Sequence, residues 1–180
     1  MKILISLLIV FMTFSVTAKD REDYKSSPGF VEFGNLEGVY GEPKVEINLG
    51  GTILSLVGKI SKHEDPELGD VIRNLDQVRV LVYELDDSAT DALNQVDTIT
   101  ATLKSKQWLP IVSVNEELEK VRVYMHQNGD IVDGMVVMVV DATANNKKKR
   151  KEAVFINIVG EINPEQLSQL TDSLDIDVNI

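Results

Sequence analysis

The chain has 180 residues, and its 18 Lys and Arg against 29 Asp and Glu give a formal net charge of −11. This excess of negative charge argues against nucleic-acid binding, because affinity for a phosphate backbone grows with the number of cationic contacts. The lack of cysteine excludes disulfides, thiolate catalysis, iron–sulfur clusters and Cys-ligated zinc. The length fits a single domain with a sizeable core.

The N-terminus has the features of an export signal. Met1 and Lys2 precede an apolar run from Ile3 to Val16, and Val16 and Ala18 take the −3 and −1 positions. A basic start, an apolar stretch of roughly 7–15 residues and a small-residue site are the parts of a cleavable signal peptide. A retained anchor is the alternative, but a membrane-spanning helix needs roughly 20 residues. We predict a signal peptide over residues 1–18, cleaved after Ala18, and a periplasmic or secreted protein without a transmembrane anchor.

The remaining chain divides into a short leader and one domain. Residues 19–29 are mainly charged and polar, so they have little to bury, and we predict a flexible leader. Ordered structure should begin near Gly29 and Phe30. Residues 30–180 are expected to form a single α+β domain.

The first half of this domain mixes strand and helix patterns. Alternating apolar residues over 44–49 predict a strand, which two glycines end. The next apolar residues have the i, i+3, i+4, i+7 spacing of one apolar helix face; they are Ile53, Leu56, Val57 and Ile60. Asp65 before Pro66 predicts the N-cap of a second helix, to about residue 74. Residues 77–85 are apolar on both faces, which predicts an interior strand.

The second half begins with a long helix and continues with strands. Ser88 and Asp91 resemble a capping box, and the helix stripe that follows is Leu93, Val96, Ile99 and Leu103. Four strand patterns come next, over 108–114, 120–127, 131–141 and 153–161. Asn128–Gly129 predicts a hairpin turn with two positive-φ positions. Asn163 and Pro164 begin a final helix, whose stripe is Leu167, Leu170 and Leu174.

The strand over 120–127 indicates the sheet type. Its apolar residues alternate with polar ones, so one face should pack and the other should meet water, as in antiparallel sheets. The element order β-α-α-β-α-β-β-β-β-α predicts an α+β fold of two layers, with helices packed on one face of a mainly antiparallel sheet of about five to six strands. The crossover from 45–49 to 77–85 is long enough for a parallel pair, so that direction stays open.

Several stretches together resemble a known family, the exported bacterial proteins described as domain of unknown function 4252. The stretches are GFVEFGNLEG (29–38), VEINLGG (45–51), DPEL (65–68), VRVLVYELD (78–86), KVRVYMHQNGD (120–130) and VFINIVGEINPEQL (154–167). The resemblance covers nearly the whole chain after the signal and implies an envelope protein without assigned chemistry. Many members resemble lipoproteins, and this chain departs from them because it lacks the cysteine that a lipid anchor requires.

Two surfaces are candidates for binding. Five consecutive cations, Lys147, Lys148, Lys149, Arg150 and Lys151, interrupt an acidic chain between the last two strands. They form either a solvated hairpin tip or a contact for an anionic envelope surface, to which each cation adds roughly 1 kcal/mol. The polar strand face with Arg122, Tyr124 and His126 is either plain solvent-exposed surface or an interaction face, because Arg and aromatic residues are enriched at interfaces.

Catalytic and metal-binding patterns are weak. His63-Glu64-Asp65 is the densest ligand-like group, but neighbouring residues at a helix end point apart, and a metal needs three or four converging donors. Gly50-Gly51-Thr52 lacks the Lys-Ser/Thr pair of a phosphate loop, no serine lies in a G-x-S-x-G elbow, and no carboxylate pair stands out. Asn157 is interpreted as a hydrogen-bonded structural amide. We predict no catalytic, cofactor or metal site.

The expected function is therefore non-enzymatic. We interpret the protein as an exported envelope protein that binds an envelope protein or an anionic envelope surface, and not nucleic acid. The alternative is a small-ligand carrier or hydrolase with a pocket between the sheet and the helices. A deep pocket with converging polar groups would favour that alternative.

Overall fold

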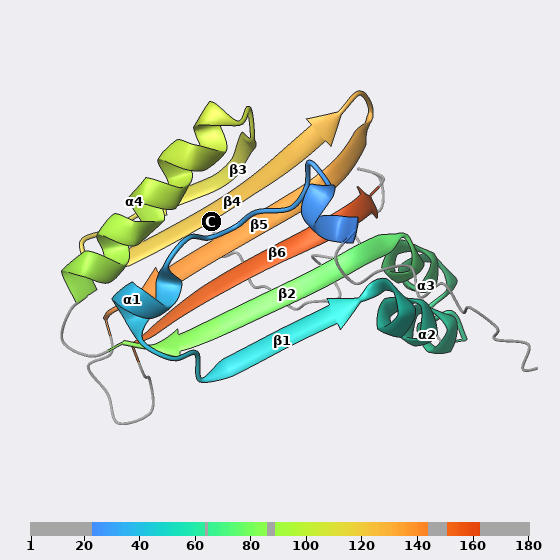
Figure 1. The fold of residues 1–180 in the computed structure, drawn as a ribbon, viewed down its shortest axis with the longest axis horizontal. Helices are drawn as coiled ribbons and strands as arrows, with labels where there is room; N and C mark the ends of the chain where they lie inside the picture. The colour runs from blue at the N-terminus through green and yellow to red at the C-terminus, as the bar shows by residue number, and fades with distance from the viewer. Residues whose placement is uncertain (1–22, 64, 86–88, 144–150, 163–180) are drawn as a thin grey trace, which may run out of the picture.

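The protein has an α+β fold built on one six-stranded antiparallel sheet, as predicted. The computed structural model describes residues 23–63, 65–85, 89–143 and 151–162. The strands are β1 (Val45–Gly50), β2 (Leu75–Glu84), β3 (Leu109–Asn115), β4 (Glu119–Asn128), β5 (Ile131–Asp141) and β6 (Glu152–Ile162). They lie side by side in the order β1-β2-β6-β5-β4-β3, and each pair is antiparallel (Figure 1).

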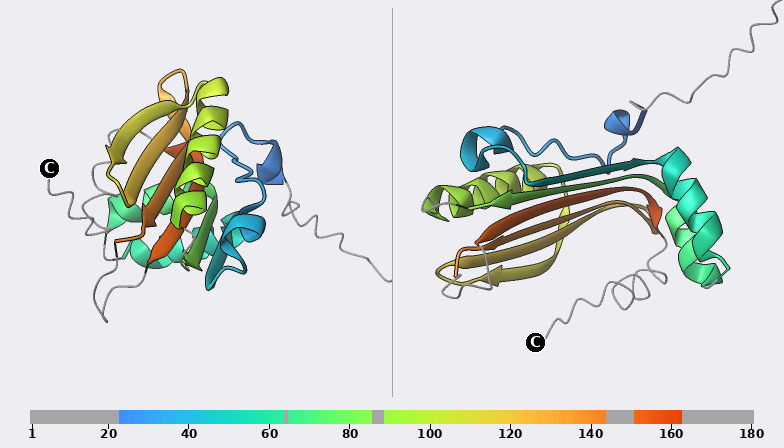
Figure 2. Two further views of the ribbon diagram at one scale, coloured as in Figure 1. Left: turned by 90° about the vertical axis from the view of Figure 1, so that its left-hand side faces the viewer. Right: turned by 90° about the horizontal axis from the view of Figure 1, so that it is seen from below.

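The helices lie in two places. They are η1 (Asp23–Ser26), α1 (Leu36–Tyr40), α2 (Gly51–Ser61), α3 (Pro66–Arg73) and α4 (Ala89–Ser105). Figure 2 shows η1, α1 and α4 on one side of the sheet, with α2 and α3 standing at the end of the strands. We call the side under α1 and α4 the covered face.

The main core fills the covered face. The predicted stripe of α4 is confirmed, because Val96, Ile99 and Leu103 are buried against the sheet while Leu93 packs at the margin. Opposite them, Leu81, Tyr83, Met138 and Phe155 come from β2, β5 and β6. Phe155 stands at the centre of an aromatic group, with ring centroids 5.3 Å from Tyr40 and 5.5 Å from Phe33.

A second core cluster closes one end of the sheet. Leu54 of α2 and Leu75 are buried together with Val132 and Ile162. The predicted cap is confirmed, because the Leu68 amide donates to Asp65 Oδ1 at 3.0 Å. The helix pair α2–α3 therefore contacts the sheet through a small set of side chains, and the apolar side of α2 is exposed.

The N-terminal segment lies on the covered face. Of the predicted leader, residues 23–26 form η1, and residues 27–29 continue to the sheet. Gly29 approaches β5 so closely that a Cβ would lie 1.8 Å from the Asp133 carbonyl oxygen. Residues 29–33 then cross over β5 and β6 towards α1 (Figure 1), which the sequence patterns did not reveal.

The hairpin between β4 and β5 differs from the predicted turn in one detail. The turn is where Asn128–Gly129 predicted it, but only Gly129 has a positive φ, of 64°. Asn128 still belongs to β4 and pairs with Ile131, so Gly129 and Asp130 are the two central residues of the turn. A glycine at the first central position is what one class of tight hairpin requires. The final predicted helix, which begins at Asn163 and Pro164, lies outside the described residues.

Candidate functional site

The face of the sheet opposite α1 and α4 is apolar across all six strands. Three rows of paired residues cross it, and every position in them is apolar. The central row is Ile47, Val80, Ile156, Val137, Val123 and Val112. The two outer rows are Val45, Val82, Val154, Val139, Val121 and Val114, and Leu49, Val78, Ile158, Met135, Met125 and Leu109. We call these three rows the apolar face.

This face is large and only partly shielded. With strands about 4.8 Å apart and about 3.3 Å per residue, the rows span roughly 24 by 13 Å between Cα positions. Side chains at the two edges are the most exposed, with Val45 at 42% and Leu109 at 44%. Soluble monomers rarely expose contiguous apolar patches beyond a few hundred Å². A face of this size is comparable with the largest apolar patches of soluble monomers, which often serve binding.

One end of the apolar face is bounded by α2 and α3. Leu49, Val78 and Ile158 of the last row pack against the cluster around Leu54. Figure 2 shows no other described helix over this side of the sheet. The other two rows are thus left without a helix among the described residues.

The apolar side of α2 is also exposed. The sequence predicts that Ile53, Leu56, Val57 and Ile60 form one apolar helix face, and in the structure this face is exposed: Leu56 is 59% and Ile60 63% exposed. The helix turns Leu54 and Gly58 inward instead. Gly58 meets α3 so closely that a Cβ would lie 2.7 Å from the Gly69 carbonyl oxygen, and this contact fixes the rotation of the helix.

The residues of the predicted interaction face on β4 lie on the covered face of the sheet. Tyr124 is 2% and Arg122 8% exposed, so the expectation that this face meets water is wrong. Tyr124 belongs to the core under α4. Arg122 donates to the carbonyl oxygens of Val114 and Val121 and to Asn115 Oδ1. A polar side chain can lie on the covered face because its polar end group bonds to such acceptors while its aliphatic stem packs against apolar neighbours.

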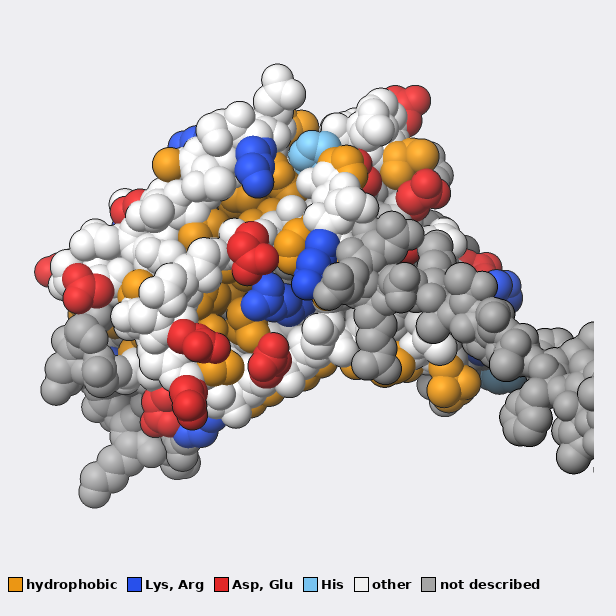
Figure 3. Space-filling model, in the orientation of Figure 1, with side chains coloured by type: hydrophobic (Ala, Val, Ile, Leu, Met, Phe, Trp, Pro, Cys, Tyr) orange, Lys and Arg blue, Asp and Glu red, His pale blue; other side chains and the backbone are white. Residues whose placement is uncertain are grey.

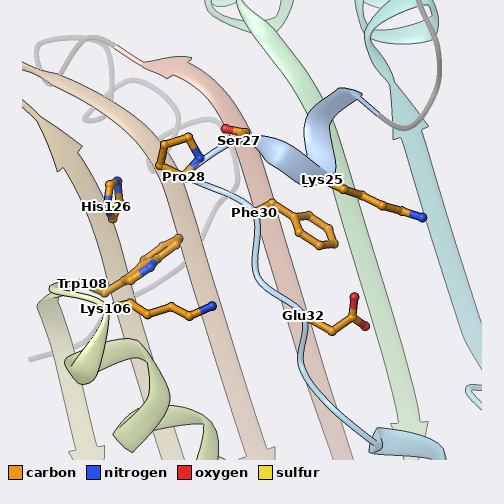
Figure 4. A pocket seen from close by; sticks show the side chains of 8 residues that line it. All are labelled: Lys25, Ser27, Pro28, Phe30, Glu32, Lys106, Trp108 and His126. Atoms are coloured by element: carbon orange, nitrogen blue, oxygen red, sulfur yellow. The ribbon is translucent and has the colours of Figure 1, made fainter.

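His126 is the member of that group which borders a cavity. Its Nδ1 lies 2.6 Å from Asp133 Oδ1, and its ring lies 5.4 Å from that of Trp108. The cavity holds about 460 Å³ and lies between the N-terminal segment, β4 and the end of α4 (Figure 4). Its lining is Lys25, Ser27, Pro28, Phe30, Glu32, Lys106, Trp108 and His126.

The cavity is open and mixed in character. Figure 3 shows apolar side chains in the hollow between α4 and the N-terminal segment, with basic and acidic side chains around its rim. The carboxylate of Asp133 can orient the imidazole of His126, as a general base requires. The sequence predicts a pocket of this kind only as an alternative, and its N-terminal wall lies in the predicted leader.

The other candidate residues from the sequence do not form a common site among the described residues. Lys147 to Arg150 lie outside the described residues, and Lys151 begins the last strand region, where the Leu85 amide donates to its carbonyl oxygen at 2.9 Å. His63 and Asp65 are exposed, Asp65 serves as a helix cap, and Glu64 is not described. Within the described ranges, no group of three His, Asp or Glu side chains could hold a metal ion.

Asn157 is the structural amide that the sequence predicts. It is 1% exposed, its Oδ1 accepts from the Val31 amide at 2.9 Å, and its Nδ2 donates to the Gly29 carbonyl at 3.0 Å. Asn157 therefore joins the N-terminal segment to β6 through hydrogen bonds.

Comparison with known proteins identifies the family. A search of curated proteins gives no significant match. Across the described parts of the chain, no helix has the length and apolarity needed to cross a membrane. The family model described as "Domain of unknown function (DUF4252)" matches residues 40–170, which is well over half of the chain, so the protein belongs to this family.

Proposed function

We propose that the protein is exported to the periplasm or beyond and acts there as a non-enzymatic binding module. Its apolar face receives an apolar surface of an envelope protein. The observation that carries this proposal is the set of three unbroken apolar rows. Fully burying an exposed Val, Leu or Ile stabilises a complex by about 1.5–3 kcal/mol, so even partial covering of several edge residues supports specific binding.

The face can be tested on the edge strand β3. Val114 belongs to the apolar face and is 36% exposed, whereas its neighbour Ser113 is exposed and pairs with Arg122 on the other side. Val114→Glu should abolish capture of the envelope partner, because a buried carboxylate without a counter-ion is costly. Ser113→Glu adds the same charge and should leave capture intact. Equal capture by both variants, at unchanged circular dichroism, would remove the apolar face from the proposal.

Export is tested separately. The support is the sequence of residues 1–18, with its basic start, apolar run and small-residue site. N-terminal sequencing of the native protein should begin at Lys19, in a periplasmic or culture fraction. A native protein that starts at Met1 in the cytosol would contradict the proposed location.

The basic run is a further contact in this proposal. At roughly 1 kcal/mol per cation near an anionic surface, residues 147–151 would give weak attachment that salt screens. Replacing all five by Gln or Ser should abolish sedimentation with phosphatidylglycerol vesicles at low salt. If sedimentation is unchanged and independent of salt, the run has no part in binding.

A second candidate function is a small-ligand carrier or hydrolase. The observation that favours it is the cavity of about 460 Å³, with the His126–Asp133 pair on its wall. A small organic acid could meet aromatic and basic side chains there. Under this candidate, a library of such acids should contain one that raises the melting temperature of the wild type but not of His126→Ala; if none does, the candidate fails.

A further inference from the structure

The two edge strands of the sheet differ in how well they could accept a further strand. β1 pairs with β2 at six consecutive positions without a shift in register, and no described element lies beyond it (Figure 1). β3 contains Pro110 and has a register shift between Pro110 and Val112. A proline and a bulge are two of the features that stop an edge strand from pairing with another chain. Of the two edges, that of β1 therefore suits a further strand.

We propose that a second copy of this chain supplies that strand. The two β1 strands pair in antiparallel direction about a two-fold axis at Ile47, and the two sheets become one continuous sheet with both apolar faces on the same side. Such an interface is self-complementary, as two-fold symmetry requires. The proposal does not rest on the envelope partner, because both β3 margins lie at the far ends of the joined sheet.

The hydrogen-bond ladder directs two amides of β1 outward. The Leu85 amide, directly after β2, donates to the Lys151 carbonyl oxygen at 2.9 Å, so the odd-numbered residues of β2 bond to β6 and the even-numbered ones bond to β1. Their partners in β1 are its three residues on the apolar face. Glu46 and Asn48 alternate with these and therefore point their N–H and C=O groups away from β2, to where the second copy would bond.

The side chains of β1 complement a second β1 in this register. On the apolar side, Ile47 faces Ile47 of the second copy and Val45 faces Leu49 of the second copy, so every cross-strand pair is apolar. On the other side, Glu46 faces Asn48 of the second copy, and these residues form hydrogen-bonded pairs through their outward backbone groups. Apolar pairs directly opposite each other stabilise a sheet.

The neighbouring registers are poorer. With the axis at Glu46, the two copies would set Glu46 against Glu46, and like charges directly opposite destabilise a sheet. With the axis at Asn48, Val45 would lie opposite Gly51, where α2 already begins. The register about Ile47 avoids both faults.

The contact is small, so the dimer should be reversible. Pairing covers edge side chains such as Val45 and Ile47, which are 42% and 40% exposed. Interfaces that bury less than about 1,200 Å² are typical of weak and transient complexes. We expect association that increases with concentration, and outward amides of β1 that exchange quickly in the dilute monomer.

Disulfide formation tests the register, because the chain has no cysteine of its own. Ile47→Cys should give a covalent dimer in a glutathione buffer, since non-hydrogen-bonded pairs have Cα atoms about 4.5 Å apart, within the range of a disulfide. Val45→Cys is the matched control: it is equally exposed, but its two copies lie four residues apart along the strands, roughly 13 Å. Equal yields, or no covalent dimer with Ile47→Cys, would overturn the proposal.

Proline substitutions test the pairing without a crosslink. Asn48→Pro removes an outward amide of β1 and should raise the dissociation constant by roughly tenfold or more. Ser113→Pro is the control on β3: the Glu116 amide donates to the Glu119 carbonyl oxygen at 2.8 Å, so the Ser113 amide also points outward, and its loss should leave dimerisation unchanged. Proline is tolerated at such positions of edge strands, and circular dichroism verifies the fold.

Sedimentation velocity from about 1 μM to about 1 mM measures these constants. A wild type that stays monomeric throughout, or equal weakening by Asn48→Pro and Ser113→Pro, would overturn the proposal. Val114→Glu should leave self-association unchanged, because it lies on β3. Its effect on capture of the envelope partner therefore decides the proposed function separately.

Discussion

One buried amide holds the N-terminal segment to the sheet. Asn157 accepts from Val31 and donates to Gly29 and, at 3.2 Å, to the Met135 carbonyl. An Asn side chain has two donors and one acceptor oxygen, and all are used here. The residue lies at the middle of β6, one of the two central strands, so the segment is bonded to an interior part of the sheet.

Asn157→Leu should lower the free energy of unfolding by about 1–3 kcal/mol, because buried polar groups lose their partners without a change in volume. Hydrogen exchange at the Val31 amide should become fast, since that amide loses its acceptor. Urea unfolding and exchange measured by NMR check both effects. The control is Asn94→Leu on the exposed side of α4; an equal loss in both variants would mean that Asn157 has no special role.

Tyr40 makes the stability of the folded protein depend on pH in the alkaline range. Its hydroxyl donates to the Ala92 carbonyl at 2.7 Å, and burial, followed by the nearby Tyr83, raises the pKa of Tyr40 above its ordinary value. The folded protein therefore keeps the proton while the unfolded chain loses it near pH 10. Stability is complete below that pH and falls as pH rises above it.

Tyr40→Phe should flatten this alkaline decline and cost about 1 kcal/mol at neutral pH through the lost hydrogen bond. Melting temperatures between pH 7 and 11 measure both effects. Tyr24→Phe is the matched control, because Tyr24 packs edge-on against Phe30 near the N-terminus of the described chain. A decline as steep in Tyr40→Phe as in the wild type would show that other groups, such as Tyr83, govern it.

At the scale of elements, local patterns were sufficient for most of the fold. Alternation predicted the strands, and β5 has the predicted bounds of 131 and 141. The helix α1 was missed, because five residues are too few for a periodic stripe; its signal is the Asn35 side chain, which accepts from the Gly38 amide. In α2 the spacing revealed that the apolar residues share a side, and not what that side meets.

The α2–α3 pair depends on two glycines in contact. A Cβ on Gly69 would lie 2.7 Å from the Gly58 carbonyl oxygen and 2.7 Å from Lys62 Cα. Gly69→Ala gains about 1 kcal/mol of helix propensity, but overpacking costs about 1–3 kcal/mol. We expect a net loss of stability with faster exchange in α2 and α3. Gly51→Ala, where the nearest atom is at 3.5 Å, should be neutral or stabilising; equal effects would contradict a packing role for Gly69.

At the scale of the whole molecule, the sequence could not tell which face of the sheet is covered. In β4 the polar residues lie under α4, and the apolar Val121, Val123 and Met125 lie on the open side. In β2, β5 and β6 the residues that line up with these are apolar too, and so are most residues on the covered face of these three strands. That pattern was visible in the sequence, but the burial of Arg122 depends on acceptors in β3 that only the fold brings near.

The strand order predicts a gradient of protection from the centre of the sheet to its edges. β6 pairs with β2 and β5, while β1 and β3 each have one neighbour, and no strand among the described residues bonds to their outward amides. Amides of β5 and β6 should exchange only through global unfolding, and those on the outer edges of β1 and β3 through local opening. Hydrogen–deuterium exchange of the isolated protein measures this. If the outward amides of β3 were as slow as those of β6, a further strand would have to be paired at this edge.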